Sequence, residues 1–248
     1  MIDELRAALG QKVSVNDTIR EHHSKDESFH TPTLPDAVVF ATCTQDVATT
    51  LKICNAHQTP VVAWGAGTSL EGNSTPIRGG VSLDLSQMDK ILRVSGEDLD
   101  CTIQPGVRRK QLNEYLSRYG LFFPVDPGAD ATLGGMASTG ASGTTTVKYG
   151  AMKQLVMSMT VVTANGEIIT TSRRARKTSA GYDLTHLFVG SEGTLGVITE
   201  LTLRLFGIPE VIASATMQFE TVREAVDGVI EVIQLGVDVA RIELVDRD

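Results

Sequence analysis

Cysteine, aromatic side chains and long apolar runs are all scarce in this 248-residue chain. The cysteines Cys43, Cys54 and Cys101 show no paired Cys-x-x-Cys spacing, which argues against a disulfide framework or a zinc knuckle and favours reduced, buried thiols. Aromatic residues make up 5% of the chain, and the net charge is −8. Because duplex binding needs a basic face, nucleic acid is excluded as the expected partner.

Two kinds of membrane or export segment are also missing. No stretch approaches the roughly 20 apolar residues that cross a bilayer. The first ten residues carry Asp3 and Glu4 and lack the apolar run of a secretory signal. We therefore expect no transmembrane segment and a cytoplasmic protein.

Glycine, by contrast, is abundant, and its first cluster follows a short apolar run. The residues 61–63 are expected to form a buried strand, and Gly65-Ala66-Gly67-Thr68-Ser69 a tight turn after it. Glycine permits positive φ and close approach, and successive N–H groups in such a turn can converge on an anion. The pattern predicts a phosphate or pyrophosphate loop, although a plain glycine turn fits these five residues equally well when they are taken alone.

Two familiar phosphate-binding loops are excluded. A Rossmann fingerprint that begins at Gly65 needs glycine at position 70, which is Leu70. A Walker A loop ends in Gly-Lys-Ser or Gly-Lys-Thr, and neither occurs in the chain. The glycine loop therefore belongs to another class of ligand site, if it belongs to one.

Two later segments have the same small, hydroxyl-rich composition: Asp126–Gly150 and Phe188–Glu200. Together with the first loop they suit an extended ligand laid along exposed backbone, and they resemble the FAD-binding domain of the vanillyl-alcohol oxidase / p-cresol methylhydroxylase (PCMH-type) superfamily. The nearest resemblance is to cytochrome-linked D-lactate dehydrogenase and the glycolate oxidase flavin subunit. The resemblance covers Pro35 to Pro209, on the motifs Trp-Gly-Ala-Gly-Thr-Ser-Leu-Glu-Gly, Gly-Leu-Phe-Phe-Pro-Val-Asp-Pro-Gly, Ala-Gly-Tyr-Asp-Leu and Gly-Ser-Glu-Gly-Thr-Leu-Gly.

This resemblance implies an α+β fold in three parts. Residues 1–34 would form an N-terminal helix and extended arm, residues 35–209 a PCMH-type FAD-binding fold of two α/β subdomains, and residues 210–248 the start of a substrate or cap domain. In the last part we expect strands at Val211–Phe219 and Arg241–Val245 around a helix opened by the capping box Thr221-x-x-Glu224. A single βαβ unit has too few strands for independent stability, so the cap domain is expected to be truncated.

Apolar periodicity predicts helices at Ile2–Leu9, at Gln45–Ala56 after a Thr44 cap, and at Lys110–Tyr119. Asn165-Gly166 between apolar runs predicts a hairpin of Met159–Val162 with Glu167–Thr170. A long strand is expected at Gly196–Leu205.

Two polar clusters are open to two interpretations each. His22, His23 and His30 lie in an irregular stretch, Val13–Leu34, and fit a solvated loop better than a metal site. The basic run Arg173–Lys177 fits a solvated turn, or alternatively a rim that attracts carboxylates near the flavin.

The resemblance also assigns the ligand contacts. The turn Gly65–Ser69 would hold the FAD pyrophosphate through backbone N–H groups, and bulk at Gly134 or Gly135 would collide with the ligand. Residues 196–198 would contact the adenosine end, and the Glu192 carboxylate would order the backbone. The first loop lacks the histidine that binds FAD covalently in some relatives, so the FAD is expected to be noncovalent. The expected cofactor-binding residues are Gly65, Ala66, Gly67, Thr68, Ser69, Gly72, Asn73, Pro127, Gly128, Thr132, Gly134, Gly135, Ser138, Thr139, Ser142, Gly143, Tyr149, Gly150, Glu192, Gly193, Gly196, Val197 and Ile198.

The implied reaction is hydride transfer from a D-2-hydroxy acid, such as D-lactate or glycolate, to noncovalent FAD, giving the 2-keto acid. The electron acceptor would be a cytochrome or quinone, the location cytoplasmic or peripheral to the inner membrane, and the assembly a homodimer or a complex with a partner subunit. No catalytic residue is assigned, because the His-x-Gly-Asp-Gly-Asn-x-His type motif of the cap domain is absent, and a divalent metal is expected only in that missing domain.

Two alternatives stay open. The chain could be a non-catalytic flavin-binding subunit or fragment that needs a partner chain. It could also be a UDP-N-acetylmuramate dehydrogenase-like reductase, which shares the fold, although the Asp-Pro-Gly and Gly-Tyr-Asp-Leu segments argue against this.

Overall fold

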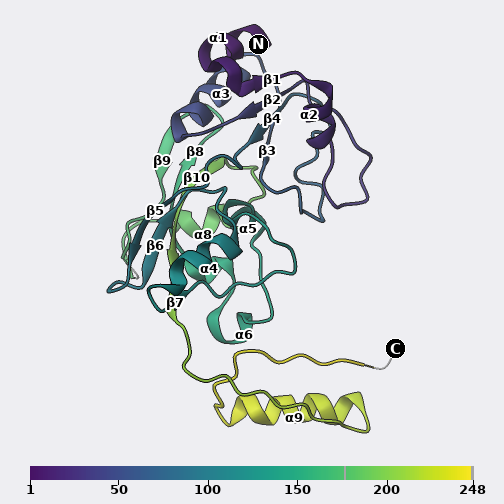
Figure 1. Ribbon diagram of the computed structural model, residues 1–248, viewed down its shortest axis with the longest axis vertical. Coiled ribbons are helices and arrows are strands. Elements are labelled where there is room, and N and C mark those ends of the chain that lie inside the picture. The colour runs from purple at the N-terminus through teal and green to yellow at the C-terminus, as the bar shows by residue number, and fades with distance from the viewer. Residues whose placement is uncertain (176, 247–248) are drawn as a thin grey trace.

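The computed structural model describes residues 1–175 and 177–246, and its main body is built on two sheets arranged one above the other along the long axis (Figure 1). One sheet has four strands in the order β1-β2-β4-β3, and the other has five in the order β5-β6-β10-β8-β9. This confirms the predicted α+β class. Arg176 of the basic run and the last two residues of the expected cap segment lie outside the described residues.

The first subdomain contains the four-stranded sheet, in which β2, β4 and β3 are parallel and β1 is antiparallel to β2. Leu5 and Leu51, from two helices, pack with Val39 and Leu83 of the sheet in one buried cluster. The elements are α1 (Ile2–Leu9), a 3-10 turn (Gly10–Lys12), β1 (Val13–Ser14), α2 (Asp17–His22), β2 (Ala37–Phe40), α3 (Thr44–Ala56), β3 (Val61–Trp64) and β4 (Val81–Asp84).

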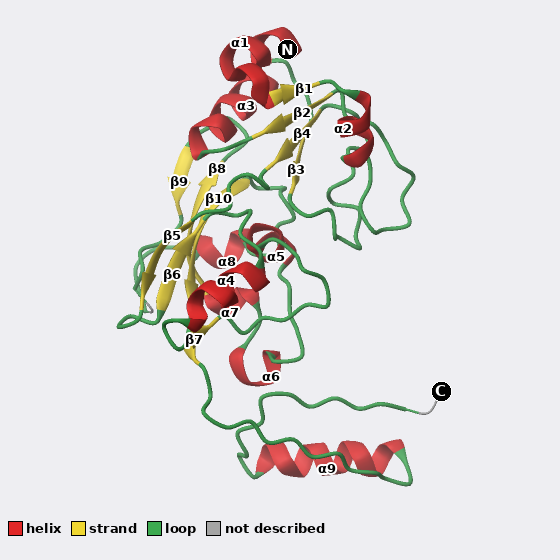
Figure 2. Ribbon diagram, viewed as in Figure 1, coloured by secondary structure: helices red, strands yellow, loops and turns green. Residues whose placement is uncertain are grey.

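The second subdomain is an antiparallel sheet with its helices on one face (Figure 2). Ile103, Met159 and Leu201 point from the sheet into a core that also takes Leu112 and Met136 from two of the helices. The elements are β5 (Ile91–Ser95), β6 (Asp100–Ile103), α4 (Arg109–Ser117), β7 (Leu121–Phe122), α5 (Leu133–Thr139), α6 (Thr146–Tyr149), α7 (Met152–Leu155), β8 (Val156–Val162), β9 (Ile168–Thr170), α8 (Leu184–Phe188), β10 (Val197–Arg204) and β11 (Phe206–Gly207), which pairs with β7.

Several predicted elements are confirmed. The first helix has the predicted bounds, and the strands β8 and β9 form the predicted hairpin, with Gly166 at φ 78° in its turn. The helix α3 starts one residue earlier than predicted, with Cys43 rather than Thr44 at the cap position. The Asp46 carboxylate accepts from the Thr42 N–H at 2.9 Å, so a side chain from the first turn ties down the entry to the helix.

The stretch from Val13 to Leu34 is more ordered than its sequence predicts. Val13 pairs with Val39 at the edge of the sheet, and Asn16 caps α2 by accepting the Ile19 N–H at 3.2 Å. The expectation of a solvated loop is wrong for His23, which is 2% exposed. Short polar elements of this kind have little apolar periodicity, so pattern analysis overlooks them.

The thiols also differ from the expectation in one respect. Cys54 and Cys101 are buried as predicted, but Cys43 is exposed. Burial raises the pKa of the Cys54 thiol to about 11 and that of the Cys101 thiol to about 12.

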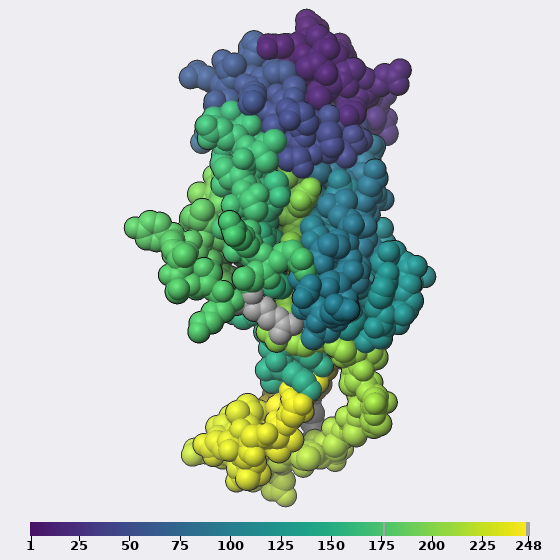
Figure 3. Space-filling model, turned by 90° about the vertical axis from the view of Figure 1, so that its left-hand side faces the viewer, coloured from purple at the N-terminus to yellow at the C-terminus, as the bar shows by residue number. Residues whose placement is uncertain are grey.

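The final part of the chain lies at one end of the body (Figure 3). Two ion pairs connect it to the second subdomain, Lys148 with Asp238 at 2.5 Å and Arg241 with Asp126 at 2.8 Å. The helix α9 (Val222–Gln234) forms as predicted, and Thr221 and Glu224 make both bonds of the capping box. The two strands expected around it do not form among the described residues, where 211–219 and 241–245 are extended without strand partners. An isolated strand leaves its backbone groups unpaired, so it needs a neighbouring strand that this segment does not supply.

Candidate functional site

The strands β2, β4 and β3 end together at one edge of the four-stranded sheet. Phe40 and Trp64 are both in register with Asp84, so the carboxyl ends of all three strands meet there. A cavity of about 510 Å³ opens at this edge and is also lined by His22 and Arg108. Ligands of open α/β sheets bind at the carboxyl ends of strands, which makes this edge the first candidate site.

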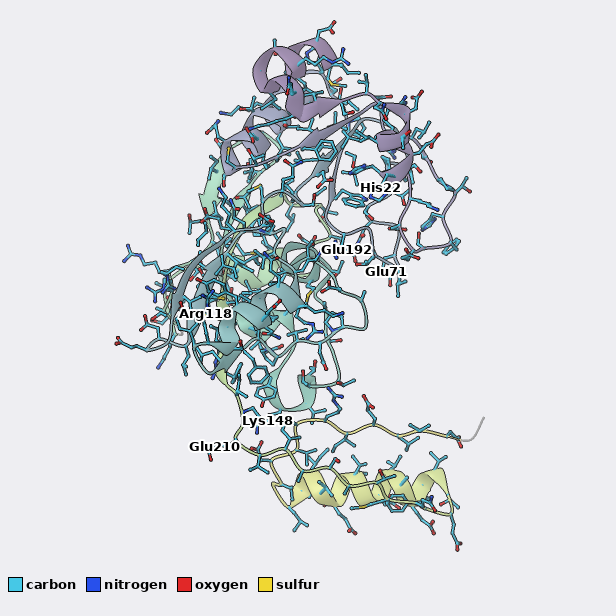
Figure 4. The ribbon with its side chains drawn as sticks, viewed as in Figure 1. His22, Glu71, Arg118, Lys148, Glu192 and Glu210 are labelled. Carbon is cyan, nitrogen blue, oxygen red and sulfur yellow. The ribbon has the colours of Figure 1, made fainter. Side chains whose placement is uncertain are left out.

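The predicted residues fall into four segments, of which the one around α6 lies at the other end of the body from this edge (Figure 1). They lie in the β3–β4 loop (Gly65, Ala66, Gly67, Thr68, Ser69, Gly72, Asn73), before and within α5 (Pro127, Gly128, Thr132, Gly134, Gly135, Ser138, Thr139), around α6 (Ser142, Gly143, Tyr149, Gly150) and at the start of β10 (Glu192, Gly193, Gly196, Val197, Ile198). Figure 4 shows His22, Glu71 and Glu192 on one side of the body, level with the junction of the two sheets.

The β3–β4 loop presents unused backbone donors. In the part of the chain that the structure describes, the N–H groups of residues 65–70 donate to no protein acceptor. Gly67 has φ 67°, and a Cβ built there would lie 2.8 Å from the Trp64 ring. Consecutive free amides in a glycine turn form an anion site, so the loop fits a ligand with several acceptor oxygens, as a pyrophosphate has.

Trp64 adds a second unused donor beneath the loop. Its side chain is 6% exposed, and within the described residues its indole Nε1 has no hydrogen-bond partner. Buried polar atoms are normally paired, so an orphaned donor at a cavity wall indicates a missing ligand acceptor or water. The residues at this edge therefore fit a polyanionic cofactor.

The glycines of α5 are used differently from those of the loop. The Leu133 and Gly134 N–H groups donate to the carbonyls of Val107 and Pro105, each at 2.8 Å. A Cβ at Gly134 would lie 2.4 Å from the Pro105 Cβ, so bulk at this position collides with protein. Gly134 is therefore a glycine of close helix packing, and its expected collision with a ligand stays a prediction.

Gly135 has more space around it than Gly134, and its expected contact with the ligand stays a prediction. It is half-buried, and a Cβ there would approach only the Thr132 hydroxyl, at 3.1 Å. Thr132 caps α5 by accepting the Gly135 N–H at 3.4 Å. The same hydroxyl would be 2.5 Å from a Cβ on Gly65, so the glycine loop and the start of α5 are in contact.

The third segment joins α5 at its other end. The Gly190 N–H donates to the Ala137 carbonyl at 3.0 Å, and the Glu192 N–H donates to the Ser138 carbonyl at 2.9 Å. The Glu192 backbone therefore makes the ordering contact. The expectation that its carboxylate does so is wrong, because that carboxylate makes no hydrogen bond within the described residues. Val197 and Ile198 are buried in the pairing of β10 with β8.

Asp126 organises the remaining residues, and the sequence analysis missed it. It accepts from the Thr144 hydroxyl at 2.9 Å and from the N–H and hydroxyl of Thr145 at 3.2 and 3.1 Å. Burial alone would raise the pKa of Asp126, but these hydrogen bonds outweigh it and lower the pKa below its ordinary value. A Cβ on Gly143 would lie 2.2 Å from this carboxylate, which explains the glycine there. The Tyr149 ring contacts Phe122 and Phe206.

Residues 35–172, more than half of the chain, match the family described as FAD binding domain. The chain belongs to this family. The resemblance found in the sequence is confirmed.

Three individual proteins show which members of the family this chain is similar to. The chain is 48% identical over 250 residues to "Probable D-lactate dehydrogenase, mitochondrial" of Danio rerio, covering 99% of this chain and 50% of that protein. It is 44% identical to "D-lactate dehydrogenase [cytochrome], mitochondrial" of Arabidopsis thaliana, covering 100% and 44%. It is also 37% identical to "Glycolate oxidase subunit GlcD" of Bacillus subtilis, covering 91% and 48%. The chain thus spans about half the length of these relatives.

Two solved structures share the architecture of this chain. An alkyldihydroxyacetonephosphate synthase superposes with a TM-score of 0.81 at 25% identity, covering 95% of this chain and 45% of that one. A p-cresol methylhydroxylase superposes with a TM-score of 0.75 at 27% identity, covering 85% and 43%. The predicted PCMH-type fold is therefore confirmed.

The basic run begins directly after the residues that match the FAD-binding family. Arg174 forms ion pairs with Asp98 at 2.6 Å and with Asp100 at 3.0 Å. Arg173 and Arg174 line a hollow of about 300 Å³ with Thr102 and Thr202, on the sheet face opposite the helices. The described residues of the run are exposed, as a solvated turn predicts, but Arg174 is held in ion pairs. None of them lines the cavity at the strand ends.

Among the described residues, no group of three or more His, Cys, Asp or Glu is placed to hold a metal ion, and no helix is long and apolar enough to cross a membrane.

Proposed function

We propose that this chain is the FAD-binding portion of a flavin-dependent oxidoreductase that oxidises a D-2-hydroxy acid, D-lactate-like or glycolate-like, to the 2-keto acid. The observation that carries the proposal is the row of free amides at residues 65–70, at the strand ends of a domain whose relatives are D-lactate dehydrogenases. Bound FAD would supply the hydride acceptor that no amino-acid side chain offers.

The residues of this chain would bind and orient the cofactor. The N–H groups of residues 65–70 would hold the pyrophosphate, and Gly135 would let the backbone come close on the other side. Trp64 would donate its unpaired Nε1 to a cofactor oxygen or to a bridging water. Val197 and Ile198 would meet the adenosine end through backbone groups only, because their side chains are buried in the two cores.

We further propose that the FAD is noncovalent, since no histidine lies between Gly65 and Asn73. Acid precipitation of the purified protein should release yellow FAD into the supernatant. Colour that stays with the pellet would refute the noncovalent attachment, and a colourless protein that takes up no added FAD would refute the binding itself.

The proposed activity needs more than these residues. The chain spans about half of its relatives, and its described residues hold no group of three or more His, Cys, Asp or Glu placed to bind a metal ion. D-lactate with an artificial electron acceptor should therefore give little or no turnover by residues 1–248, even with FAD bound, because positioning alone can account for about 7 kcal/mol of barrier. Robust turnover would show that the catalytic groups lie within this chain.

A flavin-binding subunit completed by a partner chain is the second candidate. The apolar stripe of α9 favours it, with Val222 53% and Ile233 57% exposed, because such a face needs a covering surface. Activity that appears on adding a second polypeptide, and not on extending this chain, would select this candidate.

The electron acceptor, the assembly and the cellular location of this chain are proposals that rest on the names of its relatives. The Arabidopsis relative is named as a cytochrome enzyme, so we propose a cytochrome- or quinone-type electron acceptor. A homodimer and a cytoplasmic or inner-membrane-peripheral location remain predictions. The names of two relatives place those proteins in mitochondria, and cell fractionation of the tagged protein tests the compartment.

A further inference from the structure

Residues 23–30, which we call the arm, lie before the range that matches the FAD-binding family, yet they contact the β3–β4 loop along its length. The arm follows α2 and runs beside the loop on the outer side of the first subdomain (Figure 1). Its contacts fall at the start, the middle and the end of the loop.

At the start of the loop, the arm supports Trp64. The His23 ring lies 4.4 Å from the Trp64 ring and is buried beneath it. Both ring nitrogens of His23 are hydrogen-bonded at 2.8 Å, Nδ1 to the Ile19 carbonyl and Nε2 to the Asp84 carboxylate. The ring is therefore fixed in orientation, and it holds the indole whose Nε1 is unpaired.

In the middle of the loop, a backbone bond sets the direction of the free amides. The Glu27 N–H donates to the Ser69 carbonyl at 3.0 Å. In a trans peptide the C=O of one residue and the N–H of the next point in opposite directions. The Leu70 N–H must therefore point away from the arm, so this contact determines which side of the loop carries the donor.

At the end of the loop, Asp26 makes a buried anchor. Its Oδ2 accepts from the Ser74 hydroxyl at 3.0 Å, and its Oδ1 accepts from the Ser28 N–H at 3.0 Å. Asp26 is 9% exposed and Ser74 is 7% exposed. Burial alone would raise the pKa of Asp26, but the hydrogen bonds from Ser28 and Ser74 outweigh it and lower the pKa. The carboxylate is thus charged and bonded at both oxygens.

The arm also fills the space that a glycine leaves. Gly72 has φ 80°, and a Cβ built there would be 2.1 Å from Cδ2 of His30. The loop and the arm therefore fit together as one surface, and the fit depends on the absence of a side chain at position 72.

We propose that the arm is a positioning element of the cofactor site, and that Asp26 is the positioning residue that holds the β3–β4 loop in the form that binds a dinucleotide pyrophosphate. This inference rests on the proposed FAD binding. It adds to the site a segment that lies outside the matched family range.

The Asp26→Ala variant tests this proposal by whether it tightens or weakens FAD binding. If Asp26 acted only by its charge, removing an anion beside a phosphate site would tighten FAD binding. If it positions the loop, loss of its hydrogen bonds should raise the FAD dissociation constant by about tenfold or more, because hydrogen bonds to charged groups stabilise more than neutral ones. Flavin fluorescence quenching measures the constant, at a temperature where circular dichroism shows each variant folded.

Three companion variants complete the design. Ser74→Ala removes the same bond without a charge change and should also weaken FAD binding, which keeps the test valid if Asp26→Ala fails to fold. Asp26→Asn keeps acceptor oxygen in place and should bind FAD more tightly than Asp26→Ala. Lys25→Ala, on the arm but exposed and without a hydrogen bond to the loop, should bind like the wild type.

The outcomes separate the two proposals. A wild-type chain that binds FAD while Asp26→Ala or Ser74→Ala binds it equally tightly, or more tightly, overturns the arm inference alone. A wild-type chain that binds no FAD overturns the proposed function and the arm inference with it. Weaker FAD binding in both Asp26→Ala and Ser74→Ala, together with tighter binding by Asp26→Asn than by Asp26→Ala, supports the arm as a positioning element.

Discussion

The loop from Gly65 to Asn73 and the helix α5 are both built from glycine, serine and threonine, but their backbone donors have different partners. The N–H groups of residues 65–70 meet no protein acceptor in the described chain, whereas those of Leu133, Gly134 and Gly135 are all taken up within the fold. The loop leaves its donors without protein partners, and we propose that they bind the cofactor. The helix uses its donors to fix its own position beside Pro105 and Thr132.

The difference teaches that glycine has two separate physical uses in this domain. In the loop, glycine permits a backbone with positive φ whose N–H groups are left without protein acceptors. In α5, Gly134 permits close packing against Pro105. Substitutions of glycine in the loop should therefore weaken FAD binding, whereas substitution of Gly134 in α5 should lower the stability of the fold. Substitutions at Gly67, Gly134 and Gly135 test this distinction.

The largest effect is expected for Gly67→Val. Its φ of 67° would cost a branched side chain about 1–3 kcal/mol of backbone strain, and the Cβ would press on the Trp64 ring at 2.8 Å. We expect FAD binding to be lost while the far-ultraviolet circular dichroism stays close to that of the wild type. Stoichiometric FAD in the purified variant would break the assignment of the loop as the pyrophosphate site.

Gly134→Ala should show the opposite behaviour. The added methyl would lie 2.4 Å from the Pro105 Cβ and 2.9 Å from its backbone, and overpacking of this kind costs about 1–3 kcal/mol of folding free energy. The thermal unfolding midpoint should fall, while the molecules that remain folded should bind FAD with near wild-type affinity.

Thiol labelling can locate that damage. Buried Cys101 lies in the core of the second subdomain, and buried Cys54 in the core of the first. At pH 8 only exposed Cys43 should react quickly in the wild type, because the raised pKa of the two buried thiols keeps them protonated. Faster labelling of Cys101 but not of Cys54 in Gly134→Ala would place the loosening in the core of the second subdomain, to which α5 contributes, and equal labelling of both would contradict it.

Gly135→Val sharpens the comparison within α5 itself. Its Cβ would meet only the Thr132 hydroxyl at 3.1 Å, so the fold should tolerate it better than a change at Gly134. We expect weaker FAD binding with a smaller loss of thermal stability than in Gly134→Ala. A variant that is as unstable as Gly134→Ala but still binds FAD would show that both glycines serve packing alone.

The smallest effect concerns pH, and it applies to both segments. Asp26 beside the loop and Asp126 beside the α5–α6 connection have a pKa below the ordinary value in the folded protein. A depressed carboxyl pKa adds stability above the unfolded pKa, and this stability is lost as the pH falls through the folded pKa. Thermal stability should therefore drop below about pH 4, and Asp126→Asn should reduce that drop. If the thermal stability of the Asp126→Asn variant falls with pH as it does in the wild type, Asp126 does not contribute to the loss of stability in acid.

Much of the fold was readable in the sequence, where the physics is local. Apolar periodicity identified α1, α3, α4 and α9, and the Asn165-Gly166 turn identified the hairpin, because helix and hairpin signals are held in neighbouring residues. The motifs also identified the FAD-binding family. What failed were elements without such signals: β1, α2 and the β7–β11 pair, and the two strands expected after Pro209 that have no neighbouring strand.

The sequence by itself determined the family, the position of the glycine loop and the residue types around it. Only the tertiary structure decided which glycine N–H groups stay free, that Gly134 packs on Pro105, and that Asp26 and Asp126 anchor the two segments. The physical reason is distance along the chain. Asp26 and Ser74 are separated by 48 residues, and such contacts depend on the packing of whole elements, which no local pattern records.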